Sequence, residues 1–128
     1  MSLLLDTHAF LWLAFGDDRL PKGVRARLED RSIRIHVSAV SAIEVTIKHR
    51  IGKLPHASSV AKDFGGAIAR LGLHGLPISV AEAELAGRMA GEHRDPFDRL
   101  LIAQGLLNDL TLVSNETLFD SFGVARLW

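Results

Sequence analysis

Short apolar runs alternate along the chain with segments of helical periodicity. The strongest runs predict three strands, at residues 2–5, 33–37 and 110–113. The first run is apolar throughout and leads directly into a helical segment, a pattern typical of a buried central strand in a parallel sheet. Apolar residues at helical spacing predict helices over 9–15, from Pro21 onward, from Ser38 or Ser41 to about Arg50, and over 60–71.

The rest of the chain continues the alternation. Pro77 disfavours helix in the residue before it, so 73–78 is expected to be extended. Ser79 is a helix cap, and the helix it starts is expected to run through Met89. Further elements are a helix that begins after Asp95, a short helix ending at Phe122 before Gly123, and an edge strand within 124–127.

This order of elements predicts an α/β fold with three layers, in which helices flank a mostly parallel central sheet. A chain of 128 residues is large enough for one buried core but not for two, so residues 1–128 are expected to form a single domain.

Residues 93–104 are the most informative stretch. Asp95 is a good N-cap, and Pro96 fits the first turn of the helix that follows because its missing N–H costs nothing there. Asp98 lies three residues after Asp95, which brings two carboxylates together at one helix N-terminus. Taken alone, the pair is explained as a cap and a charge that complements the helix dipole.

Composition is that of an ordinary soluble protein, with 48% hydrophobic and 23% charged residues. The absence of cysteine excludes disulfides and suits a cytoplasmic location. The apolar run near the start is too short to span a bilayer, and neither a signal peptide nor membrane association is expected. A net charge of zero argues against bulk coating of nucleic acid, although acids gathered in one pocket would leave a mildly basic surface.

Acidic residues follow the strands in a regular way. Parallel strands present their carboxyl ends on one edge of a sheet, and a helix N-terminus can point at the same edge. Carboxylates brought so close repel one another unless they bind protons or hard cations such as Mg²⁺ or Mn²⁺. Such ions activate water and polarise phosphoryl oxygens, so the chemistry implied is phosphodiester hydrolysis. The acids concerned are Asp6, Glu44, Asp98 and Glu116.

The sequence resembles the PIN-domain ribonucleases, and specifically the VapC-type toxins of bacterial toxin–antitoxin pairs. The similar segments are Leu-Leu-Leu-Asp-Thr-His at 3–8, Ser-Ala-Val-Ser-Ala-Ile-Glu at 38–44, Gly-Lys-Leu at 52–54, His-Arg-Asp-Pro-Phe-Asp-Arg-Leu-Leu-Ile-Ala-Gln at 93–104, and Leu-Thr-Leu-Val-Ser at 110–114. They extend over nearly the whole chain, and the match at 93–104 is the most specific.

The resemblance implies Mg²⁺-dependent cleavage of RNA by a toxin with a cognate antitoxin, and a homodimer is expected. Asp6, Glu44 and Asp98 correspond to the core acids of the family, and Asp95 belongs to its Asp-Pro-Phe-Asp element, where it is expected to act behind the metal ligands. The family usually has aspartate at the position of Glu116. The longer side chain of Glu116 can still reach a metal-bound water, and we expect it to matter least among the four acids.

Several residues allow more than one interpretation. Glu44 lies in an apolar helix, so it either occupies a narrow exposed stripe, which we expect from the helix alone, or pairs with a cation. Trp12 and Trp128 are expected to be core or dimer contacts rather than RNA-stacking platforms. Two arginines, Arg94 and Arg99, either bind substrate phosphate or offset the charge of the acids. His93 is expected at the surface.

The sequence disfavours two other classes of protein that have a similar fold class and an acidic site. A receiver domain needs paired acids after the first strand and a lysine after a late one, and a haloacid-dehalogenase-type phosphatase needs Asp-x-Asp, whereas this chain has Asp6-Thr7-His8. The scattered histidines do not favour a zinc site. The main alternative is a PIN fold that binds RNA or protein without cutting it.

Overall fold

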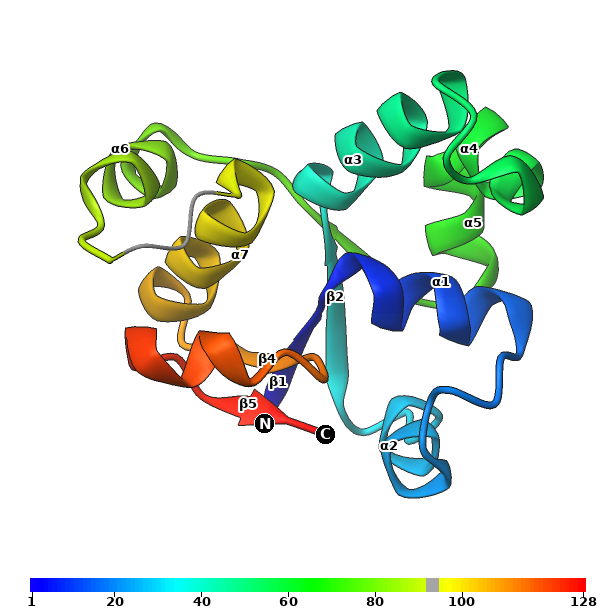
Figure 1. Cartoon of the computed structure of the whole chain (residues 1–128). Coiled ribbons are helices and arrows are strands. Elements are labelled where there is room, and N and C mark those ends of the chain that lie inside the picture. Colours follow the sequence, from blue (N-terminus) through cyan, green and yellow to red (C-terminus); the bar gives the residue numbers. More distant parts are fainter. Residues whose placement is uncertain (92–94) are drawn as a thin grey trace.

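A five-stranded parallel sheet organises the molecule, which we describe from a computed structural model covering residues 1–91 and 95–128 (Figure 1). The strands stand in the order β3-β2-β1-β4-β5, and every pairing is parallel. They are β1 (Ser2–Leu5), β2 (Arg34–Ser38), β3 (His74–Leu76), β4 (Thr111–Val113) and β5 (Arg126–Leu127). The α/β class and the parallel sheet predicted from sequence are confirmed.

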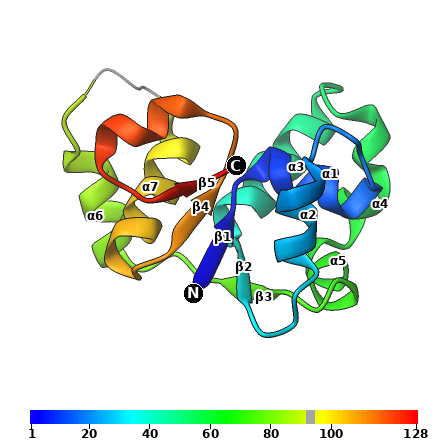
Figure 2. The ribbon, with the colours of Figure 1, turned by 90° about the horizontal axis from the view of Figure 1, so that it is seen from below.

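Helices cover both faces of the sheet, as the view from below shows (Figure 2). Helices α1, α2, α4 and α5 lie on one side, whereas α6, α7 and the 3₁₀ helix η2 lie on the other. Their bounds, with α3 and the 3₁₀ helix η1, are α1 (Thr7–Phe15), α2 (Lys22–Leu28), α3 (Ala39–Arg50), η1 (Pro55–Ala57), α4 (Ser58–Lys62), α5 (Phe64–Arg70), α6 (Val80–Arg88), α7 (Pro96–Leu107) and η2 (Thr117–Phe122).

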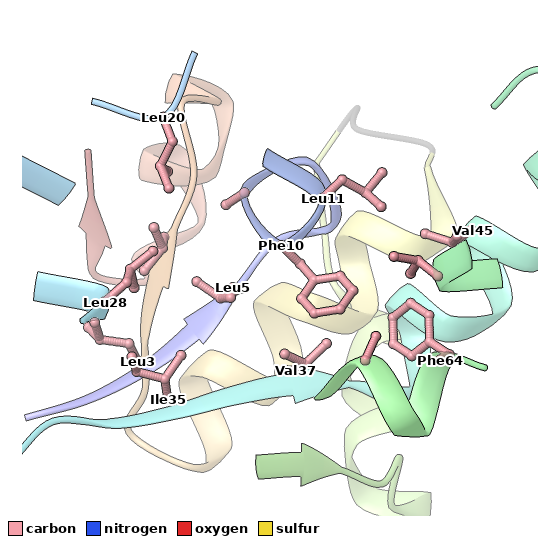
Figure 3. Packing of buried hydrophobic residues seen from close by; sticks show 14 of the residues in the cluster. Leu3, Leu5, Phe10, Leu11, Leu20, Leu28, Ile35, Val37, Val45 and Phe64 are labelled. Carbon is pink, nitrogen blue, oxygen red and sulfur yellow. The ribbon is translucent and has the colours of Figure 1, made fainter. Parts of the chain in front are cut away.

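The buried core consists of two clusters, one on each face of the sheet, because side chains alternate along β1. Leu3 and Leu5 point into one cluster, in which Phe10 of α1 packs against Phe64 of α5 with 5.0 Å between ring centroids (Figure 3). Leu4 points into the other cluster, beneath α7 and η2. The first strand is thus buried on both faces, as its uninterrupted apolar sequence predicts.

The prediction of one continuous helix over 60–71 is wrong, because the structure has two helices there, α4 and α5, separated at Asp63. The backbone of Asp63 leaves the helical conformation, with φ −150° and ψ 71°, and its carboxylate accepts a hydrogen bond from the amide of Gly66 at 3.0 Å, so that a second helix starts. A Cβ on Gly66 would lie only 2.0 Å from that carboxylate. The aspartate cap, which the periodicity of apolar residues does not reveal, explains the break.

Other elements agree closely with their predictions. Ser38 caps α3, Asp95 caps α7 with Pro96 in its first turn, and Ser79 forms a capping box with Glu82 at α6. The first helix starts two residues earlier than predicted, at Thr7, because Asp6 is its N-cap. Among the described residues, no helix is long and apolar enough to cross a membrane.

Candidate active site

The sheet order has a switch point between β1 and β4, because the chain leaves β1 for β2 on one side and reaches β4 on the other. Ligands of open α/β sheets bind at the carboxyl ends of strands beside such a point. A cavity of about 130 Å³ lies there. Its lining residues are Asp6, Thr7, His8, Glu44, Lys48, Asp95, Asp98 and Glu116. All five acids singled out in the sequence therefore border one cavity.

Asp6 directly follows β1 and is buried, with 5% of its surface exposed. Its Oδ1 accepts a hydrogen bond from the amide of Ala9 at 2.8 Å, which both starts α1 and fixes the carboxylate. Burial raises the pKa of Asp6, and the nearby charge of Glu116 adds to the increase. Hydrogen bonds from Ser114 and Ala9 and the proximity of His8 act in the opposite direction without cancelling it.

Glu44 is buried, at 6% exposure, so its expected place on an exposed stripe of α3 is wrong. Lys48, one helical turn further on, donates to Glu44 Oε2 at 2.6 Å. Thr7 of α1 donates to Glu44 Oε1 at 2.6 Å and lies 2.9 Å from the hydroxyl of Ser41. These partners explain how a carboxylate can lie inside an otherwise apolar helix.

The remaining acids approach the cavity from α7 and from the loop after β4. Asp95 accepts hydrogen bonds from the amides of Phe97 at 2.9 Å and Asp98 at 3.4 Å, so this carboxylate is committed to the helix cap. Asp98 is half-buried in the first turn of α7. Glu116 is exposed, and its backbone amide donates to the hydroxyl of Ser114 at 3.0 Å.

The donor chemistry of the cavity fits a hard divalent cation, because carboxylate oxygens from four separate segments border it. Over residues 1–91 and 95–128, however, no three acidic or histidine side chains lie close enough together to hold one ion. Lys48 supplies a positive charge to Glu44 in this arrangement. For several of these acids to bind one ion, their side chains would have to move closer together and Glu44 would have to part from Lys48.

Three residues of the cavity were not predicted. Lys48 could have been found, since it stands four residues after Glu44 in the same helix. Thr7 and His8 carry no signal of their own beyond their place after the first strand. Of the predicted flanking residues, Arg99 donates to the backbone carbonyl of Met89 rather than lining the cavity. His93 and Arg94 lie outside the described residues.

A larger hollow of about 920 Å³ lies at the opposite edge of the sheet, beside the start of β2 and β3. Its charged side chains are mainly arginines, Arg25, Arg31, Arg34 and Arg70, accompanied by Glu29 and Asp30. A hollow of that composition does not offer a set of carboxylate ligands, so its size does not make it the active site.

Replacing Asp6 with asparagine should stabilise the metal-free protein at high pH. Because burial raises the pKa of Asp6, the folded state binds more protons than the unfolded state between the two pKa values. The stability contributed by this group is present at low pH and is lost as pH rises through the folded pKa. Asparagine caps a helix about as well as aspartate and carries no charge. Asp6→Asn should therefore melt higher than the wild type in EDTA at pH 8.

Thermal melts in EDTA at pH 4 and pH 8 measure this effect, and about 1 kcal/mol corresponds to roughly 4 °C for a chain of this size. The advantage of Asp6→Asn should shrink as the pH falls from 8 to 4, because the raised pKa of Asp6 lets the wild-type carboxyl take up a proton more readily in the folded state. A variant that melts below the wild type at both pH values would show that the Asp6 charge is favourable where it lies.

The sheet order, the two helical layers and the acid-lined cavity at the switch point define an α/β fold with a carboxylate site. The PIN domain family model matches residues 3–124, and the chain belongs to this family. Domains of this family are generally nucleases. No protein curated for function matches the sequence.

Solved structures share the fold at low sequence identity. A chain of VapBC2 from Rickettsia felis, bound to a DNA fragment from the promoter, has a TM-score of 0.73 and 17% identity, with 99% of this chain and 98% of that chain covered. A chain of DNA-bound VapBC from Salmonella typhimurium has a TM-score of 0.71 and 18% identity, with 99% of this chain and 97% of that chain covered. A chain of FitAcB from Neisseria gonorrhoeae has a TM-score of 0.65 and 20% identity, with 100% of this chain and 97% of that chain covered.

Proposed function

We propose that this PIN domain is a Mg²⁺-dependent endoribonuclease and the toxin of a type II toxin–antitoxin pair. The observation that carries the proposal is the cavity at the switch point, where Asp6, Glu44, Asp95, Asp98 and Glu116 all line one small space. Buried or crowded carboxylates cost stability unless a cation or a proton compensates them, so selection for a function explains their presence better than selection for stability.

The residues divide the work as follows. Mg²⁺, or Mn²⁺ in its place, would polarise the scissile phosphodiester and lower the pKa of water when bound at this site. Asp6, just after β1, and Asp98, in the first turn of α7, would hold the cation, and the cap of Asp95 fixes the start of α7. Thr7 keeps the carboxylate of Glu44 turned into the cavity. His8 on the rim offers a ring N–H to a substrate oxygen.

Lys48 has a second part in this proposal. Its ammonium group neutralises Glu44 in the metal-free protein. With a cation bound to Glu44, Lys48 would be available to a phosphate oxygen of the substrate at the cavity wall. The same side chain thus stabilises the free enzyme and contributes positive charge to the complex with RNA.

The proposed protein partner is an antitoxin. We also propose that the chain forms a homodimer and acts in the cytoplasm. The similar solved structures are complexes named VapBC and FitAcB, and two of them hold DNA. For this chain we infer a partner that places an arginine or lysine among the carboxylates, because one cation there would satisfy their charge and block metal binding. A PIN fold that binds without cutting is the alternative. It is not favoured, because the three acids that the sequence resemblance assigns to the core of the family, Asp6, Glu44 and Asp98, all line the cavity.

Cleavage of defined substrates tests the proposal. Purified protein should cut single-stranded RNA in Mg²⁺ at internal positions, and should leave DNA of the same sequence intact. Denaturing gels of labelled RNA and DNA oligonucleotides measure the cleavage of each substrate. Failure to cut a varied pool of cellular RNA by folded protein in Mg²⁺ or Mn²⁺ would favour the non-cutting alternative.

A further inference from the structure

The outward face of α1 carries aromatic rings in place of charged side chains. His8, Trp12 and Phe15 follow one another at helical spacing, and His8 and Phe15 are exposed. The opposite face of the helix is buried, through Ala9, Phe10 and other apolar residues. Phe15 is 41% exposed. A helix that is apolar on its solvent side as well as its core side has a second surface to cover.

Two more rings extend this face into a continuous surface. Trp128 packs 5.8 Å from Trp12, and His56 lies 6.0 Å from Phe15, as measured between ring centroids. His8 and Trp12 are also 5.8 Å apart. We call these five residues, His8, Trp12, Phe15, His56 and Trp128, the aromatic strip. Both tryptophans rest partly on the core beneath, as expected from the sequence, and both keep part of their surface exposed.

The aromatic strip begins at the active-site cavity. His8 lines the cavity and contacts Trp12, so no gap separates the acids from the first rings of the strip. The C-terminal residues approach the first turn of α1 from β5, as the view from below shows (Figure 2). A polymer bound with one phosphate in the cavity would therefore meet the strip with its neighbouring residues.

Charge indicates which part of such a polymer the strip contacts. Arg19 lies over the ring of Trp12, with 5.1 Å between its guanidinium carbon and the ring centroid. The same guanidinium pairs with Asp17 at 2.7 Å, so its charge is balanced locally. Arg19 therefore covers one face of the Trp12 ring, and the surface around Trp12 offers the remaining ring surface and a planar guanidinium rather than excess positive charge. Flat faces suit bases, whereas phosphates require uncompensated cations.

We propose that the aromatic strip stacks unpaired bases next to the scissile phosphate, a role that the sequence analysis did not expect for Trp12 and Trp128. The inference rests on the proposed ribonuclease function and adds to it a binding surface with its ligand. Every base has a face that can stack, so the strip favours unpaired over paired nucleotides without reading a sequence. Bases inside a duplex are stacked on each other and cannot reach Trp12 or Trp128.

Intrinsic fluorescence gives a direct readout, because the chain has two tryptophans, both in the strip, and no tyrosine. Asp98→Asn protein in Mg²⁺ is titrated with a short single-stranded RNA, with the same RNA carrying abasic sites, and with its duplex. Stacking should quench the tryptophan emission. The abasic RNA and the duplex should bind more weakly, by about 5- to 150-fold for each stacked base lost.

Variants of the strip separate stacking from simple apolar packing. Trp12→Leu and Trp128→Leu keep an apolar side chain but remove the ring, and Trp12→Phe keeps a ring. Each leucine variant should raise KM for single-stranded RNA with a smaller change in kcat, and should lose its preference for intact over abasic RNA. Trp12→Phe should recover most of the affinity. Leu118→Ala, which removes an exposed apolar residue of η2, serves as the control and should behave like the wild type.

The outcomes bear separately on the two proposals. If wild-type protein cuts RNA but neither quenching nor a preference for intact RNA is seen, the stacking role is overturned and the ribonuclease stands. If leucine variants that fold, as judged by thermal melts, keep wild-type KM and lose only a co-purified protein, the strip is a protein contact and the inference is wrong. If wild-type protein neither binds nor cuts RNA, both proposals fail.

Discussion

Asp98→Asn is expected to reduce kcat/KM for RNA by at least about 100-fold while leaving the fold intact. Asp98 lines the cavity from the first turn of α7, where Asp95 and Pro96 fix the helix start. Asparagine preserves the size of the side chain and removes the negative charge that a cation requires. Loss of one group that stabilises the transition state typically costs about 10²–10³ in rate. Single-turnover cleavage with excess enzyme measures the effect.

Glu116→Gln provides the matched comparison, because it removes the same charge from the exposed acid of the cavity. Glu116 acts on Asp6 at a distance and is the residue that departs from the family pattern. We expect Glu116→Gln to keep at least about ten times more cleavage activity than Asp98→Asn. Equal losses in the two variants would make Glu116 a metal ligand and would overturn this ranking of the acids.

The second large effect concerns Lys48→Met in the metal-free protein. Glu44 is buried and its Oε2 is held by Lys48, so removing the ammonium leaves a carboxylate in a poorly hydrated place. A fully buried unpaired charge costs about 3–5 kcal/mol. The side chain of Lys48 is 35% exposed, so screening reduces the expected loss in free energy of unfolding to about 1–3 kcal/mol. Urea unfolding in EDTA at pH 8 measures it.

Magnesium and a second substitution sharpen this prediction. Because a bound cation replaces the missing charge, Mg²⁺ should stabilise Lys48→Met more than it stabilises the wild type. Adding Glu44→Gln to Lys48→Met should restore most of the lost stability, since the uncompensated charge is then gone. Lys62→Met, at an exposed lysine of α4, should change stability by less than about 0.5 kcal/mol. Wild-type stability of Lys48→Met would show that the pair contributes nothing.

Local sequence signals accounted for most of the framework. The uninterrupted Leu3-Leu4-Leu5 run predicts a strand buried on both faces, and the capping residues Ser79 and Asp95 predict where α6 and α7 begin. These features depend on nearest neighbours along the chain, so the sequence alone contains them. The gathering of the five acids followed from one further rule, that parallel strands end on the same edge of the sheet.

Contacts between distant segments could not be predicted in the same way. Thr7 and Glu44 are 37 residues apart, and their 2.6 Å hydrogen bond depends on how α1 and α3 pack. The outward face of α1 was equally hidden, because both sides of this helix are apolar and the pattern does not say which side meets solvent. The packing of Phe10 against Phe64 fixes which side of α1 faces the core (Figure 3). His8 and Phe15 are left exposed and Trp12 half-buried.

The central claim is that the acids at the carboxyl edge of the sheet form a metal-dependent nuclease site. Chelation and restoration of the metal in a single preparation test it most directly. Wild-type protein that cuts single-stranded RNA should stop when EDTA is added and resume when Mg²⁺ is supplied in excess, whereas Asp98→Asn should stay inactive throughout. Full cleavage in EDTA, or cleavage by Asp98→Asn at the wild-type rate, would contradict this claim.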